Sequence, residues 1–199
     1  MIPIVILAAG ASSRMQGRDK LLELVDGVAL LRRQVQRALA TGAQVLVTLP
    51  ALPHPRYEAL ADLDVGTVLV PDAAEGMNAS LRAGLAAVPQ DADAVMILLA
   101  DMPDITISDI NTMIQAVNLN SNFSIWRATT DQGDAGHPIV FHKSLLPELL
   151  TLTGDAGGAA VVKANKHRTK LIALPDAHAR TDLDTPEAWT AWRAARDVT

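Results

Sequence analysis

The segment from Ile4 to Lys20 constrains the fold of this chain more than any other. Residues Ile4 to Leu7 are branched and apolar, as a strand buried on both faces requires. Small residues follow at once, and the cations Arg14, Arg18 and Lys20 close the segment. Small side chains let backbone N–H groups approach a ligand closely, and a polyphosphate is the ligand that most needs many N–H donors together with cations. The segment therefore predicts a strand followed by a nucleotide-phosphate loop.

Two well-known phosphate-binding motifs do not fit this segment. A dinucleotide-binding fingerprint needs three glycines spaced G-x-G-x-x-G, and a P-loop needs G-x-x-x-x-G-K-[ST]. Here Gly10 and Gly17 are seven positions apart, and Leu21 follows Lys20. The missing third glycine therefore disfavours an NAD-binding module. A buried strand followed by an ordinary basic turn is the plain alternative, but it does not explain why small residues and cations occur together.

Apolar segments alternate with helical patterns along the chain. Buried-strand patterns occupy 4–7, 44–49, 66–70 and 94–99, and weaker ones occupy 123–128, 138–141 and 170–174. Helical patterns occupy 29–41, 76–88, 106–117, 145–150, 157–164 and 186–196, with a short helix that ends at 63. Gly42 suits the end of the first helix, and Thr106 with Asp109 forms a capping-box pattern. Strands separated by helices predict an α/β fold with a mostly parallel sheet and right-handed crossovers.

Composition excludes several classes of protein. Aromatic residues make up 3% of the chain and the net charge is −5, so neither base stacking nor a basic field favours a nucleic-acid partner. Without cysteine, the chain has no thiolate metal site and no cysteine nucleophile. The N-terminal apolar run is too short for a signal peptide or a membrane span, so we expect a cytoplasmic protein without a membrane partner. At 199 residues we expect one domain, as a monomer or weak dimer.

Two acidic segments lie where an open α/β sheet binds its ligands. Asp101 directly follows the apolar strand 94–99, at the carboxyl edge of the sheet, where a carboxylate can reach a bound Mg²⁺. Asp182 and Asp184 are two positions apart, so on an extended segment both carboxylates point to the same side. Capping of a turn or helix is the plain alternative for each aspartate. The spacing by itself leaves both a metal site and a structural role open.

Together these segments resemble the MobA-like nucleotidyltransferases, and most of all the molybdenum cofactor cytidylyltransferases. The signature L-A-A-G-x-S-x-R-M-G-x-x-x-K is matched at Leu7, Ala8, Ala9, Gly10, Ser12, Arg14, Met15 and Lys20, with Gln16 where a glycine is common. The family motif L-A-D-x-P is matched at 99–103, and D-[IL]-[DN]-T-P-E is matched at 182–187. The resemblance implies a three-layer sandwich of the Rossmann-like nucleotide-diphospho-sugar transferase type (GT-A-like), as a single domain over 1–199.

The resemblance also implies roles for individual residues. The nucleotide-binding set would be Leu7, Ala8, Ala9, Gly10, Ser12, Arg14, Lys20, Gly76, Ser80 and Asp101. Lys20, Arg14 and Asp101 would be catalytic, with the two cations stabilising charge that grows on a leaving pyrophosphate. Asp101 and Asp184 would hold Mg²⁺, or Mn²⁺ in its place.

The run from Gly76 to Leu85 bears on the choice of nucleotide. It resembles the G-x-x-x-S-L-x-x-G-L segment of the cytidylyltransferases, so Ser80 and the backbone of Gly76 would contact the cytosine. Guanylyltransferases of the family usually carry L-A-G-G in the first loop, and Ala9 leaves less room for a purine. We therefore expect CTP rather than GTP. In the structural alternative, Asn78 only caps the helix and Gly84 only permits close packing.

Two glycine-containing runs are expected to face the second substrate. Residues 133–138 and 154–158 resemble the G-H-P and G-D-x-G runs of the cytidylyltransferases, so the acceptor-binding set would be Gly136, His137, Asp155 and Gly157. A lone histidine beside proline is more often a loop hydrogen-bonder. The CTP-binding part would cover about 1–118 and the acceptor-facing part about 119–180.

The implied reaction transfers CMP from CTP to the terminal phosphate of molybdopterin. Three alternatives stay open: GTP as the donor, another phosphorylated acceptor, and a non-catalytic nucleotide-binding paralogue. A molybdoenzyme or its maturation chaperone is the protein partner that fits this chemistry.

Overall fold

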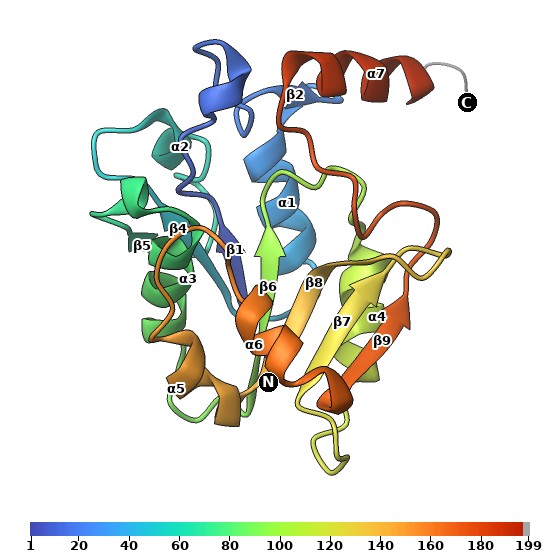
Figure 1. The fold of residues 1–199 in the computed structure, drawn as a ribbon. Helices are drawn as coiled ribbons and strands as arrows, with labels where there is room; N and C mark the ends of the chain where they lie inside the picture. The colour runs from blue at the N-terminus through green and yellow to red at the C-terminus, as the bar shows by residue number, and fades with distance from the viewer. Residues whose placement is uncertain (197–199) are drawn as a thin grey trace.

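The computed structural model describes residues 1–196, and a seven-stranded sheet runs through its centre (Figure 1). The strand order is β5-β4-β1-β6-β8-β7-β9. The strands are β1 (Ile4–Leu7), β4 (Val45–Leu49), β5 (Gly66–Leu69), β6 (Ala94–Leu99), β7 (Ile125–Thr129), β8 (Ala135–His142) and β9 (Thr169–Ala173). Of these seven, only β8 runs antiparallel to its neighbours, so the sheet is mostly parallel, as predicted.

Helices cover both faces of the sheet. They are α1 (Leu30–Leu39), α2 (Pro55–Glu58), α3 (Met77–Ala86), α4 (Ile107–Ala116), α5 (Leu146–Leu149), α6 (Ala159–Ala164) and α7 (Pro186–Arg196). Apolar side chains of α1 and α4 pack on one face, and those of α3, α5 and α6 pack on the other. In Figure 1, α3, α5 and α6 lie in front of the sheet and α4 lies behind β7. The prediction of a three-layer α/β sandwich is confirmed.

The strands owe their buried positions to continuous apolar sequence. Every residue from Val45 to Leu49 is buried, and Val5 packs in one core cluster whereas Ile4 and Ile6 pack in the other. Such strands form the centre of a sheet covered on both sides. The predicted capping box of α4 is present, because the Thr106 side chain accepts from the backbone of Asp109 and the Asp109 side chain accepts in return.

The structure differs from the sequence analysis at four places. The helix expected to end at 63 covers only Pro55–Glu58, and β8 begins at Ala135 rather than at 138. A small hairpin, β2 (Leu24–Val25) with β3 (Val28–Ala29), was not predicted, because two-residue strands carry no periodic signal. Asn78 is not the N-cap of α3; Gly76 holds that position, and the Asn78 amide instead donates to the carbonyl of Thr153.

The sheet joins the two parts that the sequence distinguishes. Strand β8, from the part beyond residue 118, pairs with β6 from the part before it, with Ile97 opposite Ile139. The carboxyl end of β6 therefore lies beside the beginning of β8, because the two strands run in opposite directions. Within the described range, no helix has the length and apolar character needed to cross a membrane.

Candidate active site

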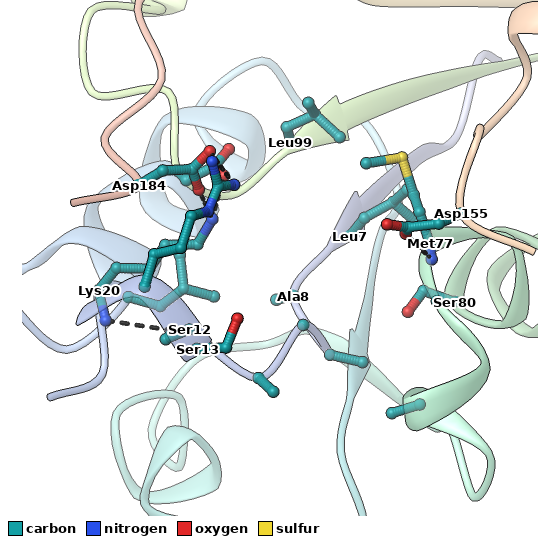
Figure 2. A pocket seen from close by; sticks show the side chains of 18 of the residues that line it. Leu7, Ala8, Ser12, Ser13, Lys20, Met77, Ser80, Leu99, Asp155 and Asp184 are labelled. Atoms are coloured by element: carbon teal, nitrogen blue, oxygen red, sulfur yellow. Dashed lines mark hydrogen bonds and ion pairs between the residues drawn. The ribbon is translucent and has the colours of Figure 1, made fainter. Parts of the chain in front are cut away.

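A cavity of about 450 Å³ opens at the carboxyl ends of β1 and β6. Its walls come from the loop after β1, the start of α3, the end of β6 and the 182–184 segment. All ten residues predicted to bind the nucleotide line it: Leu7, Ala8, Ala9, Gly10, Ser12, Arg14, Lys20, Gly76, Ser80 and Asp101. Figure 2 shows Asp184 at one end of the cavity and Met77, Ser80 and Asp155 at the other, with Ala8 between them. The cavity thus has a charged end and a less polar end.

Lys20 lies between two carboxylates at the charged end. Its Nζ atom contacts Asp101 Oδ2 and lies 2.5 Å from Asp184 Oδ1, and Arg14 Nη2 lies 2.5 Å from Asp184 Oδ2. A backbone hydrogen bond of 3.1 Å from Leu183 N–H to the Asp101 carbonyl fixes the 182–184 segment against the end of β6. Segments far apart in the chain thus bring two aspartates and two cations together.

The charges of this cluster depend on one another. Burial alone would lower the pKa of Lys20, but Asp101 and Asp184 raise it above its ordinary value, so the ammonium stays charged. Burial would raise the pKa of Asp184, yet the hydrogen bond and charge of Lys20 hold it below its ordinary value. The pKa of Asp182 is raised, first by burial and then by the neighbouring Asp184 and Asp101. Three carboxyl groups near one ammonium and one guanidinium leave room for more positive charge.

The donor set at this end fits a divalent metal ion that also binds phosphate. Asp101 Oδ1 is buried and has no hydrogen-bond partner among the described residues, and an orphaned carboxylate oxygen is a ready metal ligand. No set of three or more His, Cys, Asp or Glu side chains in residues 1–196 is arranged to hold a metal by itself. Mg²⁺ commonly takes one or two carboxylates and completes its shell with water and substrate phosphates. Asp101 and Asp184 therefore suit a metal that arrives with a nucleotide.

A buried arginine shapes the phosphate loop, and the sequence analysis missed it. The side chain of Arg56, on α2, is 2% exposed and forms two hydrogen bonds of 2.7 Å to the carboxylate of Asp19. It also donates to the Ala8 carbonyl at 2.6 Å and to Ser12 Oγ at 3.1 Å. These contacts hold both ends of the loop that carries Lys20. A lone arginine on a short helix is typical of the protein surface, so no sequence signal could have revealed that Arg56 is buried.

The backbone of the loop turns through left-handed conformations. Ser12 and Gln16 both have φ of 53°, flanking a 3₁₀ turn at Ser13–Met15. Glycine adopts this region without a steric cost, which explains why the family often has glycine where this chain has Gln16. Lys20 N–H donates to Ser12 Oγ at 3.3 Å, a contact visible in Figure 2. The loop therefore keeps its compact path although Gln16 departs from the motif.

Asp155 lies at the opposite end of the cavity from Lys20. Its Oδ1 accepts a 2.8 Å hydrogen bond from the backbone N–H of Met77 and so caps the first turn of α3 (Figure 2). A Cβ atom on Gly76 would lie 2.9 Å from that oxygen, which explains the glycine there. Asp155 was predicted to bind the acceptor, and the structure places it beside Ser80 at the less polar end.

The other three predicted acceptor residues do not line this cavity. Gly136 faces the Ala179 carbonyl, 1.8 Å from where its Cβ would be, and Gly157 faces Met77 Sδ at 2.9 Å. Both glycines thus permit close packing of chain segments. His137 lies on β8, and its pKa is lowered to about 4, first by burial and then by the charge of Arg127, although Asp101 opposes the shift. Its imidazole is therefore neutral near neutral pH.

Comparison with known proteins decides the family. The MobA-like NTP transferase domain matches residues 4–170. The chain belongs to the MobA-like NTP transferase family. Among its relatives, the purine catabolism protein PucB of Bacillus subtilis is 25% identical over 205 residues, which cover 96% of this chain and 95% of that protein. A probable molybdenum cofactor guanylyltransferase of Synechococcus elongatus is 33% identical over 115 residues, which cover 57% of this chain and 58% of that protein.

Several solved structures share the fold of this chain. Rv0371c of Mycobacterium tuberculosis has a TM-score of 0.82 and 27% identity, over 96% of this chain and 97% of that one. The same protein in complex with manganese has a TM-score of 0.79. A nucleotidyl transferase from Methanothermobacter shares the fold at 21% identity and a TM-score of 0.78, over 98% of this chain and 97% of that one. As a MobA-like NTP transferase, the protein is a nucleotidyltransferase.

Proposed function

We propose that this MobA-like transferase moves CMP from CTP to the terminal phosphate of a molybdopterin-type acceptor and releases pyrophosphate. The observation that carries the proposal is the position of Lys20, held between Asp101 and Asp184 beside a loop of small residues. Backbone N–H groups of such a loop and nearby cations suit a triphosphate, and the two carboxylates suit a metal ion bound to it. The chemistry is group transfer between two anionic molecules.

The reaction balances without a protein nucleophile. An oxygen of the acceptor phosphate attacks the α-phosphorus of the nucleotide, a new P–O bond forms, and the bond to the bridging oxygen of pyrophosphate breaks. Lys20 and Arg14, with the N–H groups of the loop, would stabilise the negative charge that grows on the leaving pyrophosphate. Arg56 would keep those groups in place through Asp19 and Ser12.

Asp101 and Asp184 are the residues that would hold the divalent cation, Mg²⁺ or Mn²⁺. When bound, the cation supplies charge neutralisation to the phosphate oxygens of both substrates. The M. tuberculosis protein Rv0371c has been solved in complex with manganese, which supports the use of a divalent metal. Lys20 already shows that a positive charge between the two carboxylates is stable in this fold.

The residues at the less polar end of the cavity support a pyrimidine as the base of the nucleotide. Ala8 and Ala9 are buried in the cavity wall, and Ser80, 5% exposed, adds a hydroxyl at the less polar end that can donate to or accept from a base edge. Ala9 has a methyl group where guanylyltransferases of the family usually have glycine, and this bulk disfavours a purine. GTP is the second candidate, because a relative with 33% identity is named as a probable molybdenum cofactor guanylyltransferase.

Pyrophosphate release measured with CTP and with GTP, each with molybdopterin and Mg²⁺, tests this function. We expect release with CTP to exceed release with GTP, and mass spectrometry to find the cytosine dinucleotide of the cofactor. We further expect Ser80→Ala to raise the KM for CTP, whereas Ser144→Ala, far from the cavity walls, leaves it unchanged. Preference for GTP would reverse the nucleotide assignment, and no transfer to molybdopterin with either nucleotide would refute the acceptor.

A further inference from the structure

Helix α7 lies beyond the carboxyl end of β6, beside the β2–β3 hairpin (Figure 1). Two ion pairs join it to this region: Arg193 Nη2 lies 3.0 Å from Glu23 Oε2, and Arg196 Nη2 lies 3.0 Å from Asp26 Oδ2. Both arginine side chains are exposed, and ion pairs of this kind contribute little to stability. Among residues 186–196 only Trp189 is buried, at 1% exposed. The indole of Trp189 is therefore the main anchor of α7.

Trp189 packs in one apolar cluster with the immediate neighbours of two site residues. Met15 directly follows Arg14, and Leu183 directly precedes Asp184. Arg14 Nη2 and Asp184 Oδ2 lie 2.5 Å apart at the charged end of the nucleotide cavity. The backbone on both sides of this ion pair is thus held by the same buried cluster. Its members, each at most 2% exposed, are Met15, Val25, Leu30, Leu183 and Trp189.

The 182–184 segment alternates between the cavity and this cluster. Asp182 and Asp184 line the nucleotide cavity, whereas Leu183 between them is 2% exposed and lies in the cluster. Leu183 N–H also donates to the Asp101 carbonyl at 3.1 Å. Because both the side chain and the backbone N–H of Leu183 are held, the position of Asp184 relative to Asp101 is set from behind the cavity.

Helix α7 also contacts the segment that follows β6. Trp192 Nε1 donates to Asp104 Oδ1 at 2.9 Å, and Asp104 lies three positions after Asp101. The rings of Trp189 and Trp192 meet edge to face, with centroids 5.9 Å apart. The two tryptophans of α7 therefore pack against all three segments that supply charge to the site: the loop after β1, the segment after β6, and 182–184.

The indole of Trp189 acts through its size and not through its N–H group. Its Nε1 atom is buried and has no hydrogen-bond partner among residues 1–196. Burying a polar group without a partner costs free energy, so the N–H group gives no stability here. What remains is a broad, flat ring that packs with Met15 and Leu183 together. Another aromatic ring at this position should therefore keep part of the effect.

We propose that Trp189 is a positioning residue for the charged end of the nucleotide cavity, an inference that rests on the metal and phosphate role proposed for that end. Its ring supports Met15 and Leu183 from behind and so keeps Arg14 at a fixed distance from Asp184. The cations that stabilise a leaving pyrophosphate and the carboxylates that hold a divalent metal thereby keep their relative positions. The less polar end, formed by α3, does not depend on this support.

The test compares the loss of two buried indoles. Trp189→Leu removes the support. Trp126→Leu is the matched control, because Trp126 is 0% exposed, has an Nε1 atom without a partner in the described part of the chain, and does not line the cavity. Pyrophosphate release is measured at a temperature at which urea unfolding curves show that both variants are folded.

We expect kcat to fall roughly 10–100-fold in Trp189→Leu, because a displacement of about 1 Å at reacting groups has an effect of this size. We expect kcat to change less than about twofold in Trp126→Leu, and Trp189→Phe to recover most of the loss. The KM for the nucleotide should change less than about threefold in all three variants, because the contacts of α3 with the base are kept.

A second measurement depends neither on transfer nor on the base. Calorimetry measures binding of the complex of Mn²⁺ with inorganic tripolyphosphate. We expect its Kd to rise at least about fivefold in Trp189→Leu and to stay unchanged in Trp126→Leu. If Trp189→Leu does not fold, Leu183→Val takes its place, because it removes a single methylene group from the same cluster; we expect it to raise this Kd about threefold.

The outcomes separate this inference from the proposed function. Equal kcat and equal Kd in Trp189→Leu and Trp126→Leu would refute the positioning role and leave the function standing. Binding of the complex by Leu183→Val as tight as by the wild type would refute the positioning role as well. Weaker binding in Trp189→Leu alone, in a protein that transfers no nucleotide to molybdopterin, would support the positioning role and refute the proposed reaction. A wild-type protein that does not bind the complex would refute both.

Discussion

Lys20 is the residue on which the chemistry of the site depends most. Its ammonium contacts carboxylates from two segments, at Asp101 and Asp184, and its side chain is only 15% exposed. The sequence selected Lys20 because cations follow a small-residue loop and because the family signature L-A-A-G-x-S-x-R-M-G-x-x-x-K ends in this lysine. What the pattern could not give was its partners, since they lie 81 and 164 positions away.

We predict that Lys20→Ala lowers kcat roughly 10²–10³-fold, the cost of losing one well-placed donor to developing charge. Steady-state pyrophosphate release measures the effect. Arg18→Ala is the matched control, because Arg18 belongs to the same loop but pairs with Glu23 and does not line the cavity. Near-wild-type turnover in Lys20→Ala would exclude the assigned role.

Arg56 is the second decisive residue, and we predict that Arg56→Met destabilises the fold by about 3 kcal/mol. The change leaves Asp19 with a partly buried charge and no guanidinium, a situation that costs several kcal/mol. Urea unfolding measures the loss. The control is Arg32→Met, which breaks a similar two-bond contact to Asp62 on the surface and should have a much smaller effect. Equal losses in the two variants would contradict the importance of the buried contact.

Among the elements, α3 shows how closely helix and sheet must approach to form the cavity. A Cβ atom on Gly84 would lie 2.4 Å from Val5 Cγ1 and 3.0 Å from Thr48 Cγ2. The helix therefore rests directly on β1 and β4, and this contact places Ser80 at the cavity wall. The structural alternative for Gly84, that it permits close packing, is the one that the geometry supports.

We predict that Gly84→Ala lowers the free energy of unfolding by about 1–3 kcal/mol, because the added methyl group forces α3 away from the sheet. Gly10→Ala is the control for stability, since a Cβ atom there meets nothing within 4 Å and should change stability by less than about 0.5 kcal/mol. Urea denaturation of the two variants distinguishes them. If both were equally stable, the close approach of α3 would not matter.

At the scale of the whole molecule, one sheet joins the part of the chain that forms the nucleotide cavity to the part beyond residue 118. The antiparallel strand β8 joins the parallel part, β5-β4-β1-β6, to the pair β7 and β9. His137 lies on β8 near this junction, and its lowered pKa couples folding to pH. The single domain, the cytoplasmic location and the monomer or weak dimer stay predictions.

The sign of this pH dependence follows from the two states of His137. The unfolded chain takes up a proton near pH 6.5, whereas the folded protein resists protonation until about pH 4, so stability falls as pH decreases between these values. We predict that His137→Gln flattens this part of the profile, measured as urea midpoints from pH 7 to pH 4. The exposed His167→Gln should not change the profile. A His137→Gln profile identical to the wild type would contradict the assignment.

The sequence by itself determined the order of strands and helices along the chain and the place of the phosphate loop, and the family resemblance pointed to Asp101 and Asp184. The elements and the loop depend on local patterns: a continuous apolar run, or small residues next to cations. Only the tertiary structure decided which polar groups meet. Arg56 contacts Asp19 across 37 positions, and Asp155 caps α3 across 78. A side chain's local sequence does not specify whether distant backbone will cover it, so its burial and its capping contacts appear only when the sheet assembles.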